Sequence, residues 1–232
     1  MSGASLSIIM PVLNEAVGIE TALQALTPYR TRGVEIVVVD GGSGDGTPDL
    51  AHPLADQVFT APRGRALQMN AGAAAAKGDV LLFLHADTRL PEDADALVVD
   101  GLSRSGRVWG RFDVRIDGGG VLVLIAIMMN TRSRLTGIAT GDQAMFVSRA
   151  AFENAGGFPK IAVMEDIALS AQLKRRSRPL ILRTRATTSA RRWRQHGTLR
   201  TMLLMWRLRL LYYFGADPAR LAYQYGNVAD KH

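Results

Sequence analysis

Carboxylates stand directly after the apolar runs in the first half of the chain. Glu15 follows "LSIIMPV", and Asp40 is the last residue of "EIVVVD". Asp87 follows "DVLLFL", with His85 between the run and the carboxylate. An apolar run that ends in a carboxylate is typical of a buried strand that brings one charge to the edge of a sheet. Because ligands bind outside the carboxyl ends of the strands in open parallel sheets, we expect these side chains to lie at one site.

The positions of the glycines exclude two kinds of nucleotide site. A dinucleotide-binding fold has its glycine-rich turn after the first strand. Here "PVLNEA" closes the first strand, and "GGSGDGT" (41–47) follows the second. The GxxxxGK[ST] pattern of P-loop ATPases is also absent from the sequence. Taken alone, "GGSGDGT" is equally consistent with an ordinary turn.

Short apolar runs alternate with helical patterns through the first half of the chain. The expected strands are 6–12, 35–40, 56–61 and 79–84, and the expected helices are 14–26, 65–78 and 91–102. Asn14 is the expected N-cap of the first helix, and Gly78 the expected end of the second. This alternation predicts an α/β fold with a mostly parallel sheet and helices on both faces.

The rhythm changes after about residue 105. The segment 107–116 alternates and predicts a strand at an exposed edge, and 143–148 predicts another strand. Helices are expected at 165–176 and, as a long basic amphipathic helix ending at Gly215, at 198–215. The segment "NTRSRLTGIATGDQ" (130–143) is expected to form loops that shape a pocket.

Composition describes an ordinary folded protein of one or at most two domains, with 232 residues, 47% of them hydrophobic and 21% charged. The absence of cysteine excludes disulfides and thiolate metal sites. The N-terminus has no basic region typical of a signal peptide. The longest apolar stretch, 121–129, is well short of the ~20 residues that span a bilayer. We therefore expect a soluble, cytoplasmic protein.

The net charge of +7 is unevenly distributed. No Asp or Glu occurs between Ile167 and Ala216, while Lys and Arg recur throughout that stretch. A block of one sign predicts a phosphate-bearing partner, which is a nucleotide, a nucleic acid or an anionic lipid. A solvated basic face explains the same block without any partner.

Four segments together resemble glycosyltransferase family 2. They are "SIIMPVLNEAVGIETALQAL", "EIVVVDGGSGDGT", "NAGAAAAKGDVLLFLHADT" and "GGFPKIAVMEDIALSAQL", in that order and at fitting spacing. The resemblance covers roughly residues 5–195 and is greatest to a bacterial subgroup whose metal motif reads HAD. It implies the GT-A fold, which is a Rossmann-like sheet with flanking helices, here followed by a C-terminal helical extension.

The resemblance implies a role for each matching residue. The nucleotide-binding residues would be Pro11, Val12, Asn14, Glu15, Asp40, Arg63, Arg65, Asn70, His85 and Ala86. Asp40 would accept a hydrogen bond from the base, typically uracil. Asp87 would hold Mg²⁺ or Mn²⁺, cations that prefer oxygen ligands and often take only one or two carboxylates beside the substrate's phosphates. Asp166, next to Glu165, would be the catalytic base. Simple capping of a helix N-terminus is the alternative for this acidic pair.

Three positions depart from the family pattern. The usual DAD-type motif reads His85–Ala86–Asp87, and we interpret His85 as a neighbour of the ligand or a space-filling residue, because imidazole suits Mg²⁺ poorly. Gly41 stands where the usual "VDDGS" has a second carboxylate. "SARRW" (189–193) is similar to the QxxRW motif of processive synthases but has Ser189 in place of Gln. Arg192 and Trp193 are nevertheless candidates for contact with the diphosphate or the acceptor.

These observations predict an inverting, metal-dependent, non-processive glycosyltransferase. A nucleotide-sugar, expected to be a UDP-sugar, would donate to a small-molecule or lipid acceptor. The GT-A domain would cover 1–195, with a nucleotide half (5–104) and an acceptor half (105–195), and the basic helix and tail would cover 196–232.

Other readings of the chain remain open at this stage. The alternatives are a nucleotidyltransferase on a similar sheet and a basic module that binds nucleic acid or an anionic membrane. The 198–215 helix fits contact with the inner face of a membrane, with a homodimer mate or with its own core equally well.

Overall fold

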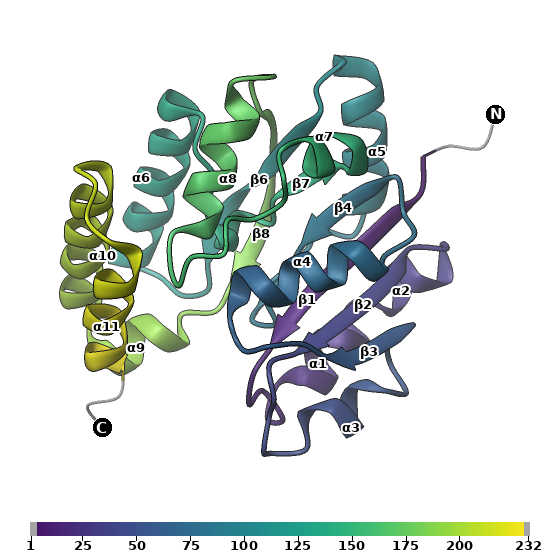
Figure 1. Cartoon of the computed structure of the whole chain (residues 1–232), viewed down its shortest axis with the longest axis horizontal. Coiled ribbons are helices and arrows are strands. Elements are labelled where there is room, and N and C mark those ends of the chain that lie inside the picture. The colour runs from purple at the N-terminus through teal and green to yellow at the C-terminus, as the bar shows by residue number, and fades with distance from the viewer. Residues whose placement is uncertain (1–3, 230–232) are drawn as a thin grey trace.

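A computed structural model describes residues 4–229, and the side chains at positions 192, 195, 196, 199 and 225–229 are outside that description. In the described residues, eight strands form one sheet in the order β3-β2-β1-β4-β7-β6-β8-β5. Helices cover both faces, and a group of helices at the C-terminal end lies at one side of the molecule (Figure 1). The predicted α/β architecture is confirmed.

The first half of the sheet is parallel. β1 (Leu6–Val12) lies between β2 (Glu35–Asp40) and β4 (Val80–Phe83), and β3 (Gln57–Thr60) pairs with β2. The parallel register aligns Val12 with Asp40. All four predicted strands are therefore confirmed, and the carboxyl ends of β1, β2 and β4 point to the same edge of the sheet.

Both faces of these strands are buried, which explains their continuous apolar sequences. On β1, Ile8 and Met10 face one core cluster, and Ile9 faces the other. The first cluster is covered by α1 (Ile19–Gln24), α2 (Thr27–Thr31), α3 (Thr47–Ala51) and α5 (Ala94–Ser105). The second is covered by α4 (Arg65–Ala75), α7 (Arg149–Asn154) and α8 (Glu165–Lys174). Gly72 lets α4 approach closely, because a Cβ there would lie 2.4 Å from a methyl carbon of Ile9.

Two helix boundaries in this half differ from the expectation. Asn14 is not an N-cap, because it adopts a left-handed conformation (φ 52°) and α1 begins only after Gly18. The helix α4 ends at Ala75 rather than at Gly78. Gly78 instead lies against β1, where an added Cβ would come within 2.6 Å of the backbone nitrogen of Ser7.

The second half of the sheet is mixed. β7 (Phe146–Ser148) runs antiparallel to both β4 and β6 (Trp109–Ile116). β8 (Leu180–Thr188) runs parallel to β6, and the short β5 (Thr88–Arg89) runs antiparallel to the end of β8. Strands β5 and β8 were not expected from the sequence.

The prediction that 107–116 forms an exposed edge strand is wrong. β6 lies inside the sheet, and its polar residues Arg111 and Asp113 are buried. They form an ion pair with each other, and Arg134 also bonds Asp113. Arg111 and Asp113, whose polarity suggests solvent exposure, are therefore paired in the interior, although Nε of Arg111 has no partner among the described residues.

The prediction that 130–143 forms loops is also wrong for its first half. The helix α6 (Val121–Thr136) includes both the apolar stretch 121–129 and the residues up to Thr136. Asn130 of α6 bonds the backbone of Val114 in both directions, at 2.8 and 2.9 Å, and so fixes the helix on β6. Only the short 3₁₀ helix η1 (Gly141–Gln143) and its flanks remain loop-like.

The C-terminal helices form the rest of the fold. α9 (Arg191–His196), α10 (Thr198–Tyr213) and α11 (Pro218–Ala229) gather at one side, beside α6 (Figure 1). A small core formed by Leu208, Leu221 and Met164 joins α10 and α11 to the segment before α8. No helix among residues 4–229 is both long and apolar enough to cross a membrane.

Candidate active site

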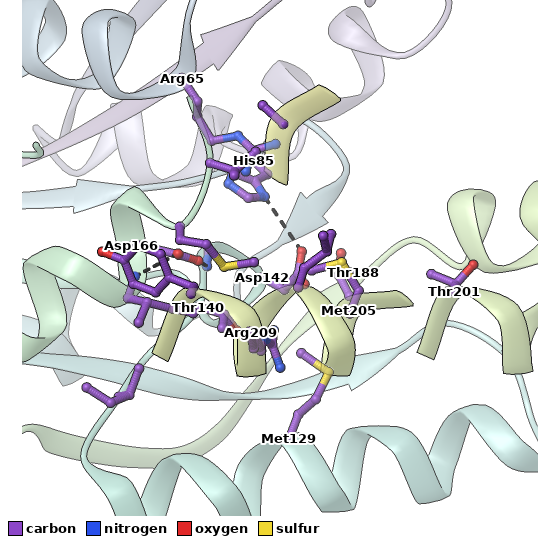
Figure 2. A pocket seen from close by; sticks show the side chains of 18 of the residues that line it. Arg65, His85, Met129, Thr140, Asp142, Asp166, Thr188, Thr201, Met205 and Arg209 are labelled. Atoms are coloured by element: carbon purple, nitrogen blue, oxygen red, sulfur yellow. Dashed lines mark hydrogen bonds and ion pairs between the residues drawn. The ribbon is translucent and has the colours of Figure 1, made fainter. Parts of the chain in front are cut away.

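A cavity of about 1730 Å³ lies between the carboxyl edge of the sheet and the C-terminal helices. Helices α6, α8 and α10 contribute its far wall (Figure 2). Most of the residues predicted for the site line this cavity, namely Pro11, Val12, Glu15, Arg63, Arg65, His85, Ala86, Asp87, Asp166 and Trp193. The sheet thus brings together segments that are far apart in sequence.

Hydrogen bonds join the segment after β1 to the turn after β2. The backbone N–H of Asn14 donates to Ser43 Oγ (2.8 Å), and the side-chain oxygen of Asn14 accepts from the N–H of Gly44 (3.0 Å). Asp45 accepts from Ala16 and Thr47, and the bonds from Thr47 hold the pKa of Asp45 below its usual range. The "GGSGDGT" turn therefore supports the wall that Pro11 and Val12 present to the cavity.

Asp40 lies beneath this turn and is only 2% exposed. One carboxylate oxygen accepts from the N–H groups of Gly42 (2.8 Å) and Ser43 (2.9 Å), and the other accepts from the Ser43 hydroxyl (2.5 Å). Asp40 is not among the residues that line the cavity. Burial under the turn, rather than a lack of free lone pairs, therefore keeps Asp40 from the cavity.

Gln68 occupies the space next to Gly41. Its side-chain amide donates to the carbonyl oxygens of Val12 (2.8 Å) and Val39 (2.9 Å). A Cβ at Gly41 would lie 3.1 Å from the Gln68 oxygen, so a larger residue at 41 would press on this buried amide. Gly41, which replaces the second carboxylate of the family motif, thus leaves room for the Gln68 amide. This amide links α4 to β1 and β2.

The segment after β4 places His85 inward and Asp87 outward. The His85 ring lies against Gly141, where an added Cβ would come within 2.3 Å of it, and its Nδ1 is 3.6 Å from a carboxylate oxygen of Asp142. Asp87 is exposed at the mouth of the cavity. Gly141 is therefore the residue that makes room for His85, and Asp142 is a site residue that the sequence did not single out.

The donor set at Asp87 fits a cation that brings other ligands with it. Among the described residues, no cluster of three or more His, Cys, Asp or Glu side chains could hold an ion. A magnesium ion in proteins commonly takes one or two carboxylates and completes its shell with water and substrate phosphates. The single exposed carboxylate of Asp87 fits a cation that takes its remaining ligands from water and substrate phosphates.

Glu165 and Asp166 begin α8 but have different surroundings. Glu165 is 1% exposed and contacts Arg65 at 3.3 Å, and burial raises its pKa, with the charge of Asp166 adding to the rise. Asp166 lines the cavity and accepts from the N–H of Gly141 (2.8 Å). Of the two, only Asp166 faces the space where a substrate would lie.

An ion pair links the first strand to α9 across the mouth of the cavity. The Arg191 guanidinium donates to both carboxylate oxygens of Glu15, with a shortest distance of 2.9 Å. This bond raises the pKa of Arg191, and the nearby charge of Asp87 acts in the same direction. The sequence prediction selected the next residue, Arg192, whose side chain lies outside the described part of the chain. Trp193 lines the cavity.

Asn70 has a structural contact instead of a place in the cavity. Its side chain donates to the carbonyl of Phe158 (2.8 Å) and accepts from the N–H of the same residue (2.9 Å). It is not among the lining residues. Asn70 therefore fastens the "GGFP" segment, which leads to α8, onto α4.

Comparisons with known proteins agree with this geometry. The family model "Glycosyl transferase family 2" matches residues 7–152. An uncharacterised glycosyltransferase of Mycobacterium tuberculosis is 34% identical over 122 residues, which are 47% of this chain and 45% of that protein. The chain thus spans less than half the length of this curated relative.

Solved structures show the same fold. S. aureus TarS 1–349 in complex with UDP-GlcNAc aligns with a TM-score of 0.66 at 17% identity, over 80% of this chain and 58% of that one. The mannosyltransferase PcManGT from Pyrobaculum calidifontis, in complex with GDP-Man and Mn²⁺, aligns with a TM-score of 0.65 at 19% identity, over 99% of this chain and 71% of that one.

The structure predicts that Asn70→Ala weakens folding and leaves nucleotide binding unchanged. The substitution leaves the buried N–H and carbonyl of Phe158 without partners, which costs about 1–3 kcal/mol. Urea unfolding measures the loss, and a UDP titration measures binding. Asn154→Ala, at an exposed amide on α7, is the matched control. If Asn70→Ala binds UDP far more weakly while its stability is unchanged, Asn70 belongs to the nucleotide site after all.

Proposed function

The chain belongs to glycosyl transferase family 2 and has the GT-A fold, and from that premise we propose that it transfers a sugar from a nucleotide-sugar to an acceptor hydroxyl. One observation carries the proposal. A single cavity at the carboxyl edge of the sheet contains the Pro11–Glu15 segment, the exposed carboxylate of Asp87 and the inward carboxylate of Asp166. In the proposal, these three features serve as a wall for the nucleotide, a ligand for a cation and a general base.

The proposed donor is a UDP-sugar. Support comes from the likeness to TarS, solved with UDP-GlcNAc, and the likeness to the GDP-Man complex of PcManGT makes a GDP-sugar the competing donor. Pro11 and Val12 would contact the base and ribose, on a wall held by the turn above Asp40. The exposed Arg63 and Arg65 at the start of α4 would face the diphosphate.

Asp87 is the proposed ligand of Mg²⁺ or Mn²⁺. When bound, such a cation neutralises the negative charge that grows on the departing diphosphate. The negative charge of Asp87 contributes to the raised pKa of Arg191, so the two residues are near each other. The hydrogen bonds to Glu15 hold Arg191 in place. The ion pair would therefore keep a positive group at the mouth of the cavity without closing it.

Asp166 is the proposed base, and Glu165 is proposed to act through Arg65. The acceptor oxygen attacks the anomeric carbon, its proton passes to Asp166, and the bond between that carbon and the diphosphate oxygen breaks. The Gly141 N–H keeps the Asp166 carboxylate oriented. Glu165 is too deeply buried to meet a substrate, and its contact with Arg65 would orient the guanidinium that faces the phosphates.

The alternative functions have less support. Family membership favours sugar transfer over a nucleotidyltransferase and over a nucleic-acid-binding module. The exposed apolar residues of α10, Leu203, Trp206 and Leu210, keep membrane contact as a prediction, because a dimer mate could cover the same face. The identity of the sugar and the acceptor, including a lipid acceptor, stays a prediction as well.

We predict that metal-dependent UDP binding requires Asp87. In Asp87→Ala, the Mn²⁺-dependent gain in UDP affinity should disappear while metal-free binding remains, because only the cation ligand is lost. Asp40→Ala should weaken UDP binding with or without metal, since the turn loses its support. Calorimetric titration with and without EDTA measures both, and Asp100→Ala, at a carboxylate on α5 that is 61% exposed, is the control. If UDP binds with equal affinity with and without metal, and equally to the unchanged chain and to Asp87→Ala, Asp87 is not a ligand of the cation.

We predict that Asp166→Asn binds the donor normally but transfers sugar about 10²–10⁴-fold more slowly, the range for losing a general base. The amide keeps the size of the side chain and cannot take the proton. Initial rates against a panel of nucleotide-sugars and acceptors measure the effect. Asp142→Asn, which changes another carboxylate of the same cavity, is the matched comparison. A larger loss in Asp142→Asn than in Asp166→Asn would transfer the role of base to Asp142.

We predict inversion at the anomeric carbon and the addition of one sugar per acceptor. A base on one side and a diphosphate leaving from the other favour a single in-line displacement. NMR coupling constants of the product's anomeric proton give the configuration, and mass spectrometry gives the product length. A retained configuration would exclude Asp166 as the base of a single displacement, and a ladder of products would show processive transfer.

A further inference from the structure

Two arginines line the cavity on the side away from the proposed donor site. Arg132 comes from α6, and Arg209 comes from α10. In Figure 2, Arg209 lies beyond Asp142, on the opposite side from Arg65 and His85. Neither arginine matches a motif in the sequence, and the proposed transfer reaction gives neither of them a role.

Both guanidinium groups have buried nitrogen atoms without partners. These atoms are Nε and Nη2 of Arg132 and Nε of Arg209, and none has a hydrogen-bond partner among the described residues. Leaving a buried charged donor unsatisfied is costly, and a guanidinium does not lose its proton to avoid the cost. Because both residues also line the cavity, their guanidinium groups indicate a ligand with oxygen acceptors.

The charges in this part of the cavity also favour an anion. Burial lowers the pKa of Arg132 to about 10, and repulsion by Arg209 is the next cause. Asp166 and Asp142 oppose these effects, but each already has another contact. Asp166 accepts from the Gly141 N–H, and Asp142 lies 3.6 Å from His85 Nδ1. The two arginines are close enough to repel each other inside the cavity, and an anion between them would relieve that repulsion.

We propose that Arg132 and Arg209 bind a phosphate group of the acceptor, an inference that rests on the proposed function. A guanidinium presents parallel N–H donors that fit phosphate oxygens, and two of them balance a phosphate dianion. Met129 and Met205 line the cavity beside this pair and offer an adaptable apolar wall for the rest of the acceptor. A phosphate held here places the acceptor's hydroxyl groups toward Asp166, between the two halves of the cavity.

Titration with phosphate probes tests the site directly. Inorganic phosphate and glycerol 3-phosphate are added to the full chain with saturating UDP and Mg²⁺, and glycerol is the uncharged comparison. Both phosphate probes should raise the melting temperature and give saturable heats, whereas glycerol should do neither. Binding in the presence of UDP is expected because the arginine pair lies apart from the proposed donor site.

Variants locate the phosphate. Arg132→Met and Arg209→Met each remove a charged donor group while keeping the apolar stem, and each should weaken phosphate binding about 10–100-fold. Arg207→Met, at an exposed arginine of the same helix, should bind phosphate like the unchanged chain. UDP affinity should be the same in all three variants. If a methionine variant does not fold, Arg132→Lys and Arg209→Lys are used in its place. Lysine keeps the charge but lacks the parallel N–H donors of a guanidinium, so phosphate binding should weaken less than the loss of about 10–100-fold expected for methionine.

Vesicles distinguish a lipid phosphate from a free one. Sedimentation is measured with phosphatidylcholine vesicles that either contain or lack phosphatidic acid, whose headgroup is a phosphate monoester. Binding that needs phosphatidic acid and is lost in Arg132→Met but kept in Arg207→Met supports a lipid acceptor. Binding of the soluble probes alone supports a free phosphorylated acceptor.

Three results would overturn the proposal. They are phosphate binding that persists in both methionine variants, phosphate that competes with UDP in the unchanged chain, and vesicle binding that falls equally in Arg207→Met. The competition experiment needs no variant. Failure of the proposed function itself gives a different result, because UDP would then not bind while the phosphate titration could still succeed.

Discussion

Burial of the parallel strands on both faces is the constraint on which the site depends. Side chains within β1, β2 and β4 must be apolar because each face packs against helices, so polar groups can occur only where the strands end. The parallel pairing brings those ends to one edge. Glu15, Asp40 and Asp87 therefore stand close together because the interior excludes them, and the cavity forms where the helices leave that edge open.

Charges at this edge divide into those that hold the structure and those that face the cavity. Asp40 and Asp45 use their oxygens to fix the turn after β2, and Glu165 is buried against Arg65. Asp87 and Asp166 keep their carboxylates toward the cavity. The carboxylates that hold the structure matter for function, because a reacting side chain must be kept within a fraction of an ångström of its productive geometry. Carboxylates that occur in similar sequence patterns therefore differ in their contacts. The buried ones hold the structure, and those that line the cavity are available to a ligand.

Strands, their parallel order and most of the cavity lining could be predicted from the sequence because apolar runs and the residues at their ends are local signals. Tertiary contacts decided the remaining features. The alternation of β6 predicts an edge strand, because the sequence does not reveal that Arg111 and Asp113 pair with each other inside the sheet. The resemblance implies that Asn70 binds the nucleotide, and only the fold reveals that its amide forms two hydrogen bonds with the backbone of Phe158. Asp142, Arg132 and Arg209 become site residues only when α6, η1 and α10 fold over the sheet, and no spacing in the sequence reveals that.

The C-terminal helices complete the site from the side that the sheet cannot reach. The ends of the parallel strands form one wall of the cavity, the proposed donor side, and later segments of the chain form the opposite wall. α6 supplies Arg132 and α10 supplies Arg209, while Arg191 of α9 binds Glu15 at the end of the first strand. The basic character of residues 167–216 therefore has two physical explanations within one chain. Arg207 is solvated on the outside of α10, whereas Arg209 has a buried guanidinium nitrogen beside the cavity, where the proposed acceptor phosphate would neutralise it. In the proposed reaction, the wall that meets the acceptor is therefore made by helices, and the wall that meets the donor is made by the ends of buried strands.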